Sequence, residues 1–201
     1  MTARTRAQKV AVMCAPYLDA IKIGYPLVLS SGLGIARDLT SLGLPLIADF
    51  KVADIPFTNR LICDQVFQAG FQAVIVHGFP GRDSVQACVD SAHSYGGRCL
   101  VVAEMSHPGA LEFFPAVSER IALLATECGA EGIIAPATRP ERIARLREIV
   151  GSRKIYAPGV GAQGGNLEKA SLLADGIIVG RAIYDSPDPE EAARRFTAIR
   201  R

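Results

Sequence analysis

The chain has 201 residues, of which 49% are hydrophobic and 21% charged, and its net charge is only +2. This length suffices for one domain with a substantial buried core. The near-neutral charge gives no reason to expect a nucleic acid or a membrane as partner, and no apolar run reaches the roughly 20 residues of a membrane span. The five cysteines are scattered and no secretory leader is recognisable, so we expect reduced thiols in a cytoplasmic protein.

In chain order, a helix is predicted first, over residues 2–18, where apolar residues recur at helical spacing. Short apolar runs then alternate with longer amphipathic stretches. The runs predict strands over 20–23, 45–48, 73–76, 99–103, 132–135, 155–157 and 176–179. The stretches predict helices over 29–42, 56–69, 83–95, 118–128, 140–150, 166–173 and 189–199. Short, wholly apolar strands separated by helices are typical of a parallel sheet that is covered by helices.

Polar and glycine residues follow nearly every predicted strand, and this favours an α/β fold of the (β/α)8 TIM-barrel class. A doubly wound sheet would concentrate such residues at one switch point. The pattern contains seven strands where a closed barrel needs eight. We therefore expect residues 1–201 to form a single barrel domain from which the first strand is missing.

An acid–base cluster follows the second predicted strand. Asp49 and Lys51 are two residues apart, so in an extended chain both side chains point to the same side. Lys22 lies within the preceding apolar strand, where an unpaired ammonium would be costly, and Asp49 can supply its partner. A purely structural ion pair is the alternative, but three charged residues within six (49–54), at the face where barrels place their chemistry, favour a catalytic site.

Two glycine-bearing loops follow the last two predicted strands. The first, over residues 157–165, contains four glycines, and the second contains Gly180 and Arg181. Loops at these barrel positions often bind phosphate, because glycine lets backbone N–H groups approach closely and arginine adds a forked cation. The histidines have no acidic neighbours at ligand spacing, so no metal site is expected. Ser106 ends a strand and is better placed than His107 to contact a substrate.

Several segments together resemble archaeal-type orotidine 5′-monophosphate decarboxylases. They are residues 22–29, the D-x-K-x-x-D element over 49–54, and residues 76–79, 104–109, 158–165 and 178–181. The D-x-K-x-x-D element alone marks a wider superfamily, whereas the ordered set is far more specific. The resemblance implies a TIM barrel that converts orotidine 5′-monophosphate to uridine 5′-monophosphate in de novo pyrimidine biosynthesis, with no cofactor.

The resemblance also implies a role for individual residues. Lys51 matches the proton donor to C6 of the pyrimidine, and Asp49 matches the carboxylate beside that of the substrate. Lys22 and Asp54 complete an alternating array in which the last aspartate comes from a partner subunit. Ile55 and Thr58 accompany it, which implies a homodimer with shared active sites. The implied contacts to pyrimidine, phosphate and the apolar part of the nucleotide are Ser106, Gln163, Gly180, Arg181, Pro158 and Val160.

In the family, a first strand ending in a ribose-binding aspartate precedes the segment that matches Thr2 onward. We expect that the start has been set downstream of the natural one, or that this strand has been lost. Two other functions are compatible with parts of the pattern. One is a Mg²⁺-dependent sugar-phosphate decarboxylase or aldolase of the same superfamily, and the other is an inactive nucleotide-binding remnant. Lys22 and the 105–109 segment favour the nucleotide substrate.

Overall fold

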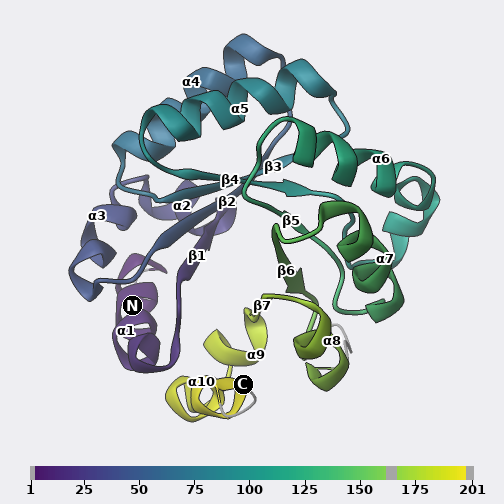
Figure 1. Cartoon of the computed structure of the whole chain (residues 1–201). Helices are drawn as coiled ribbons and strands as arrows, with labels where there is room; N and C mark the ends of the chain where they lie inside the picture. Colours follow the sequence, from purple (N-terminus) through teal and green to yellow (C-terminus); the bar gives the residue numbers. More distant parts are fainter. Residues whose placement is uncertain (1–2, 162–166, 198–201) are drawn as a thin grey trace.

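The computed structural model describes residues 3–161 and 167–197. In this part of the chain seven parallel strands form one sheet, and each strand pairs with the next along the sequence. The sheet curls, with helices on its outer side (Figure 1). The strands are β1 (Ile21–Gly24), β2 (Leu46–Val52), β3 (Ala73–His77), β4 (Arg98–Val102), β5 (Gly132–Ile134), β6 (Lys154–Pro158) and β7 (Gly176–Ile178). This is a TIM-barrel topology with one strand fewer in the described residues, as the sequence predicted.

The helices follow the strands in alternation, so the C-terminal ends of all described strands lie at one edge of the sheet. The α-helices are α1 (Ala3–Cys14), α2 (Tyr25–Ser31), α3 (Ile35–Leu39), α4 (Pro56–Gln68), α5 (Arg82–Ser94), α6 (Phe114–Glu127), α7 (Pro140–Val150), α8 (Leu167–Leu173), α9 (Arg181–Tyr184) and α10 (Pro189–Thr197). Short 3-10 helices cover Ala15–Tyr17, Thr40–Leu42 and Pro108–Glu112. No helix in the described ranges combines the length and the apolar character needed to cross a bilayer.

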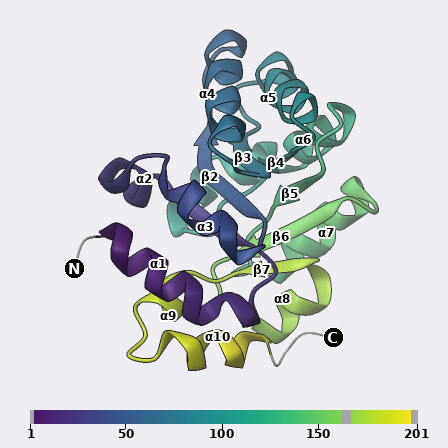
Figure 2. The same cartoon turned by 90° about the vertical axis from the view of Figure 1, so that its left-hand side faces the viewer.

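The two ends of the described chain meet beside the open side of the sheet. Helix α1 lies next to α10, close to the edge strands β1 and β7 (Figure 2). The hydroxyl of Thr197 donates to the carbonyl of Tyr17 at 2.8 Å, and Cys14 packs with Ile183 and Ala193 in a small apolar cluster. These contacts hold the first and last helices together, although β1 and β7 do not pair with one another.

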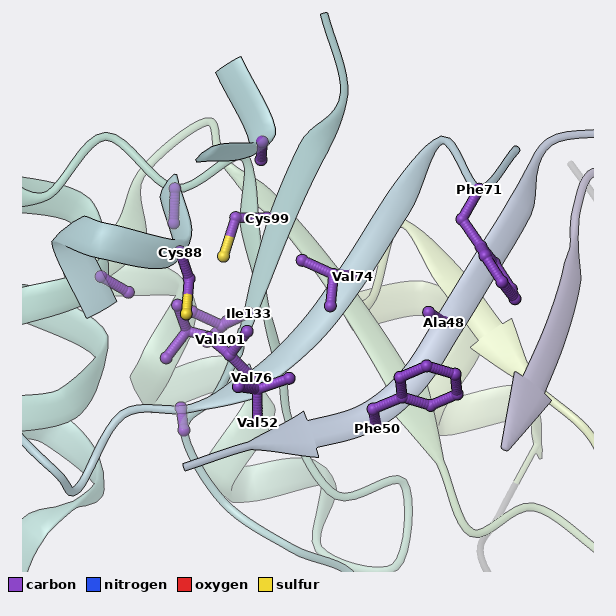
Figure 3. Packing of buried hydrophobic residues seen from close by; sticks show 14 of the residues in the cluster. Ala48, Phe50, Val52, Phe71, Val74, Val76, Cys88, Cys99, Val101 and Ile133 are labelled. Atoms are coloured by element: carbon purple, nitrogen blue, oxygen red, sulfur yellow. The ribbon is translucent and has the colours of Figure 1, made fainter. Parts of the chain in front are cut away.

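The core has two sides because successive strand residues face opposite surfaces of the sheet. The outer side carries Val74, Val76 and Val101, which pack under the helices together with the thiols of Cys88 and Cys99 (Figure 3). The inner side carries a smaller cluster that contains Ile75, Leu100, Val102 and Ile134. All five cysteines are buried and free, as the sequence predicted.

Several local predictions differ from the structure. The strand predicted over 45–48 is β2, which continues to Val52, so Asp49 and Lys51 lie within the strand and not after it. The helix predicted over 29–42 is two short helices, because Gly32 (φ +74°) ends α2 in a backbone conformation that a helix cannot contain. Helix α6 begins at Phe114 rather than Ser118, with Pro115 in its first turn, where the missing N–H is not needed. Arg181, expected in a loop, begins the four-residue helix α9.

Candidate active site

One carboxylate holds two ammonium groups at the inner face of the sheet. Lys22 donates to one oxygen of Asp49 at 2.6 Å, and Lys51 donates to the other at 2.7 Å. The Asp49 side chain is only 12% exposed, whereas those of Lys22 and Lys51 are 28% and 37% exposed. The ion pair expected between Lys22 and Asp49 is therefore present, and Lys51 shares the same carboxylate.

Strand register explains this convergence. In the β1–β2 pairing, Lys22 lies opposite Ile47 and Gly24 lies opposite Asp49. The Lys22 side chain therefore reaches Asp49, two residues further along the neighbouring strand. Ile47 packs on the inner side of the sheet and Ala48 on the outer side. Asp49, two residues after Ile47, consequently faces inward with Lys22. The alternation of side chains along β1 and β2 thus decides which groups meet.

The backbone is irregular at Lys51. Ala48 lies opposite Val74 but Val52 lies opposite Val76, so β2 contains extra residues between these pairs, as in a β-bulge. Within this irregular stretch Lys51 adopts φ +48°, a left-handed conformation that costs a non-glycine residue roughly 1–2 kcal/mol. It is the one non-glycine residue with positive φ in the described ranges. Strain of this kind persists where surrounding contacts fix a functional side chain.

The two lysines keep Asp49 ionised. Burial by itself would raise the pKa of this carboxyl group, because burial disfavours the charged form. The ion pairs and hydrogen bonds with Lys22 and Lys51 outweigh burial, and the pKa lies below its ordinary value. Asp49 therefore remains a carboxylate in neutral solution and fixes the direction of the Lys51 ammonium.

His77 ends β3 next to this array. Its ring lies against Phe79, with centroids 4.8 Å apart, and its Nδ1 is buried without a hydrogen-bond partner. Burial lowers the pKa of His77, the positive charge of Lys51 lowers it further, and Asp49 offsets part of the effect, so that the pKa is about 4. His77 is thus a neutral imidazole at the mouth of the sheet.

A cleft of about 1630 Å³ contains the charged array and opens between β1 and β7. Lys22, Asp49, Lys51, His77 and Gly180 are among the residues that line it. Ser106, Pro158 and Val160 follow β4 or lie at the end of β6, so they belong to the same edge of the sheet without lining this cleft. Arg181 is exposed at the start of α9, directly after Gly180. Gln163 lies outside the described residues.

Asp54, Ile55 and Thr58 lie apart from the array, at the start of α4. Asp54 is exposed, and its carboxylate accepts the backbone N–H of Ile55 at 2.7 Å. Asn59, which the sequence analysis missed, holds this loop: its fully buried amide accepts from the Asp54 N–H and donates to the Asp54 carbonyl. A polar residue on the buried face of α4 was the signal that could have revealed it.

A second charged cluster lies beside Ser106, and no local sequence pattern identifies it. The carboxylate of Glu104, two residues after β4, is 1% exposed and accepts hydrogen bonds from Arg139 and Arg142. Among the described residues no group of three or more histidine, cysteine or acidic side chains has the arrangement of a metal site.

The chain is similar to known proteins over nearly its whole length. The profile of the orotidine 5′-phosphate decarboxylase / HUMPS family matches residues 1–196. The chain belongs to this family. The orotidine 5′-phosphate decarboxylase of Methanosarcina barkeri is 55% identical over 197 residues, which cover 97% of this chain and 89% of the relative. That of Thermococcus kodakarensis is 50% identical over 96% of this chain and 90% of its own length.

Solved structures of the family have the same fold. The Methanocaldococcus jannaschii orotidine 5′-monophosphate decarboxylase in complex with the inhibitor BMP superposes with a TM-score of 0.94 at 42% identity, over 98% of this chain and 92% of that one. The Pyrococcus horikoshii enzyme gives a TM-score of 0.89 at 48% identity, over 99% and 95% of the two chains. Both confirm the TIM-barrel class that the sequence predicted.

The strained backbone at Lys51 gives a stability prediction. Lys51→Gly and Lys51→Ala both remove the ammonium that pairs with Asp49, but only glycine adopts the left-handed conformation without a penalty. After allowing for glycine's greater freedom in the unfolded chain, we expect Lys51→Gly to be about 0.5–1 kcal/mol more stable than Lys51→Ala. Urea unfolding of both variants measures the difference. A more stable Lys51→Ala would contradict the strain.

The buried imidazole gives a pH prediction. An unfolded chain protonates His77 near pH 6.5, whereas the folded protein does so only at about pH 4. The unfolded state therefore binds more protons between these values, and the free energy of unfolding decreases as the pH falls from about 6.5 to about 4. His77→Asn should lose this part of the pH dependence. An NMR titration of the ring with a midpoint near 6.5 would contradict the account.

Proposed function

We propose that this chain is a carbon–carbon lyase that decarboxylates orotidine 5′-monophosphate to uridine 5′-monophosphate in de novo pyrimidine biosynthesis, without a metal or organic cofactor. The observation that carries the proposal is the Lys22–Asp49–Lys51 array at the mouth of the sheet. Membership of the family and the named activity of the relatives that are 50–55% identical support it.

The array suits the chemistry of this decarboxylation. When the bond between C6 and the carboxylate breaks, carbon dioxide leaves and the electron pair stays on C6 of the pyrimidine. The Lys51 ammonium stabilises that developing charge and then delivers a proton to C6, after which solvent reprotonates the amine. Asp49 lies beside the substrate carboxylate, and two such charges about 4 Å apart repel by roughly 4 kcal/mol at an effective dielectric of 20. Departure of neutral carbon dioxide relieves that repulsion.

The rest of the nucleotide binds around the same edge of the sheet. We assign Ser106 to the pyrimidine, Pro158 and Val160 to the apolar side of the pocket, and Gln163, Gly180 and Arg181 to the phosphate. Support for the phosphate site comes from Gly180, which lines the cleft that contains Lys51, and from Arg181 beside it. Binding energy gained at the phosphate, far from C6, can be used to orient the reacting end of the substrate.

The active enzyme is a homodimer in which Asp54, Ile55 and Thr58 complete the site of the partner subunit. Support comes from the start of α4, where large apolar side chains are exposed: Ile55 (63%), Phe57 (71%) and Leu61 (51%). Apolar side chains gathered in this way mark protein interfaces.

The cellular location and the domain organisation follow from other features. The free buried cysteines fit a reducing cytoplasm, and the described elements fit one domain.

Lys51 gives the direct test of the activity. The loss of absorbance of orotidine 5′-monophosphate is followed with a chelator present, for the wild type and for Lys51→Ala. We expect an active wild type and a variant whose kcat falls by at least about 10³, because the variant has lost both the charge that stabilises the transition state and the proton donor. Loss of this wild-type activity on chelation would contradict the cofactor-free mechanism. Chelator-sensitive turnover of a sugar phosphate, with none of the nucleotide, would instead indicate the Mg²⁺-dependent relative. Uridine 5′-monophosphate binding without turnover would indicate an inactive remnant.

Subunit mixing tests the shared site. Lys51→Ala and Asp54→Ala homodimers should each be nearly inactive. After equimolar exchange, half of the dimers are mixed, and each mixed dimer contains one intact site, so about a quarter of the wild-type activity should return. No recovery, despite exchange verified by mass spectrometry, would show that Lys51 and Asp54 act within one chain.

A further inference from the structure

We infer that Glu104 is a positioning residue for this decarboxylation, which holds Ser106 in place through Arg139 and Arg142. The inference rests on the proposed function, in which Ser106 contacts the pyrimidine. Glu104 itself is buried beneath the mouth of the sheet and acts only through the chain segment that it anchors.

Both oxygens of Glu104 are occupied by different arginines. The Nε of Arg139 donates to Oε1 at 3.0 Å, and the Nε of Arg142 donates to Oε2 at 3.0 Å. The two arginines come from the loop before α7 and from its first turn. Glu104 therefore ties the end of β4 to the beginning of α7 by two separate ion pairs.

Residues directly before α7 also hydrogen-bond to the backbone that leads to Ser106. A guanidinium nitrogen of Arg139 donates to the carbonyl of Met105, and the Thr138 hydroxyl donates to the carbonyl of Ser106 at 3.1 Å. The backbone N–H of Glu104 donates to the carbonyl of Ile134 at the end of β5. Three consecutive residues, 104 to 106, are thus held from one side by β5 and the start of α7.

Stability alone is a poor reason for such a cluster. A carboxylate that is 1% exposed has lost its water, and a buried ion pair often stabilises a fold no better than apolar residues of the same volume. Its distinctive effect is geometric, since two forked guanidinium groups fix the position of the carboxylate and of the backbone beside it. A contact residue held in this way is ready for the substrate before binding.

A double-mutant cycle between Glu104 and Ser106 separates positioning from general stability. Glu104→Gln keeps the size of the side chain but removes the charge. We expect it to lower kcat/KM for orotidine 5′-monophosphate about ten-fold in the wild type, and less than about two-fold when Ser106→Ala is already present. A purely structural role predicts the same factor in both backgrounds, and that result would overturn the inference.

Two further variants complete the experiment. Arg139→Gln, at a partly exposed position, removes the contacts to Glu104 and Met105, and it replaces Glu104→Gln in the same cycle if the latter does not fold. Arg145→Gln is the control, since this arginine lies on the same helix but pairs with Glu119 and Glu148 at the surface, and its kcat/KM should be unchanged. An inactive wild type would refute the proposed function, whereas an active wild type with equal penalties would refute only the positioning role.

Discussion

The ionised state of one carboxylate is the constraint on which the site depends. Asp49 accepts from Lys22 and Lys51 with different oxygens, so it neutralises one ammonium and orients the other. If Asp49 took up a proton, two ammonium groups would share a partly buried site without a counter-charge, which is costly. In the proposed mechanism, the protonated group would also no longer repel the carboxylate of the substrate. Ground-state repulsion and proton delivery in that mechanism therefore depend on this single charge.

The fold provides this arrangement through the alternation of strand residues and one irregularity. The regular part of β2 places Ala48 and Phe50 in the outer core, where Phe50 packs on Phe71, and leaves Asp49 on the inner side. The alternation continues through the bulge before Val52, so Lys51, despite its left-handed backbone, also lies on the inner side with Asp49. Packing on the outer side of the sheet thus supports strain on the inner side.

Features that depend on local periodicity could be predicted from the sequence. These include the strand–helix alternation, the shared direction of Asp49 and Lys51, and the pairing of Lys22 with Asp49 on the next strand. Features that depend on distant contacts could not. The partners of Glu104 are 35 and 38 residues away along the chain, and nothing in the local pattern identifies them. The left-handed Lys51 was also missed, because a bulge depends on the register of the neighbouring strand.

The most direct test of this account is the titration of the Asp49 carboxyl carbon by ¹³C NMR, in the wild type and in Lys22→Met. We expect a wild-type pKa below 3.8, the ordinary value for this group, because the two ammonium groups outweigh burial. Removal of one ammonium in Lys22→Met should raise that pKa. A wild-type carboxyl group that protonates above 3.8, or one that is insensitive to Lys22, would contradict the claim that Asp49 is the charge on which the site depends.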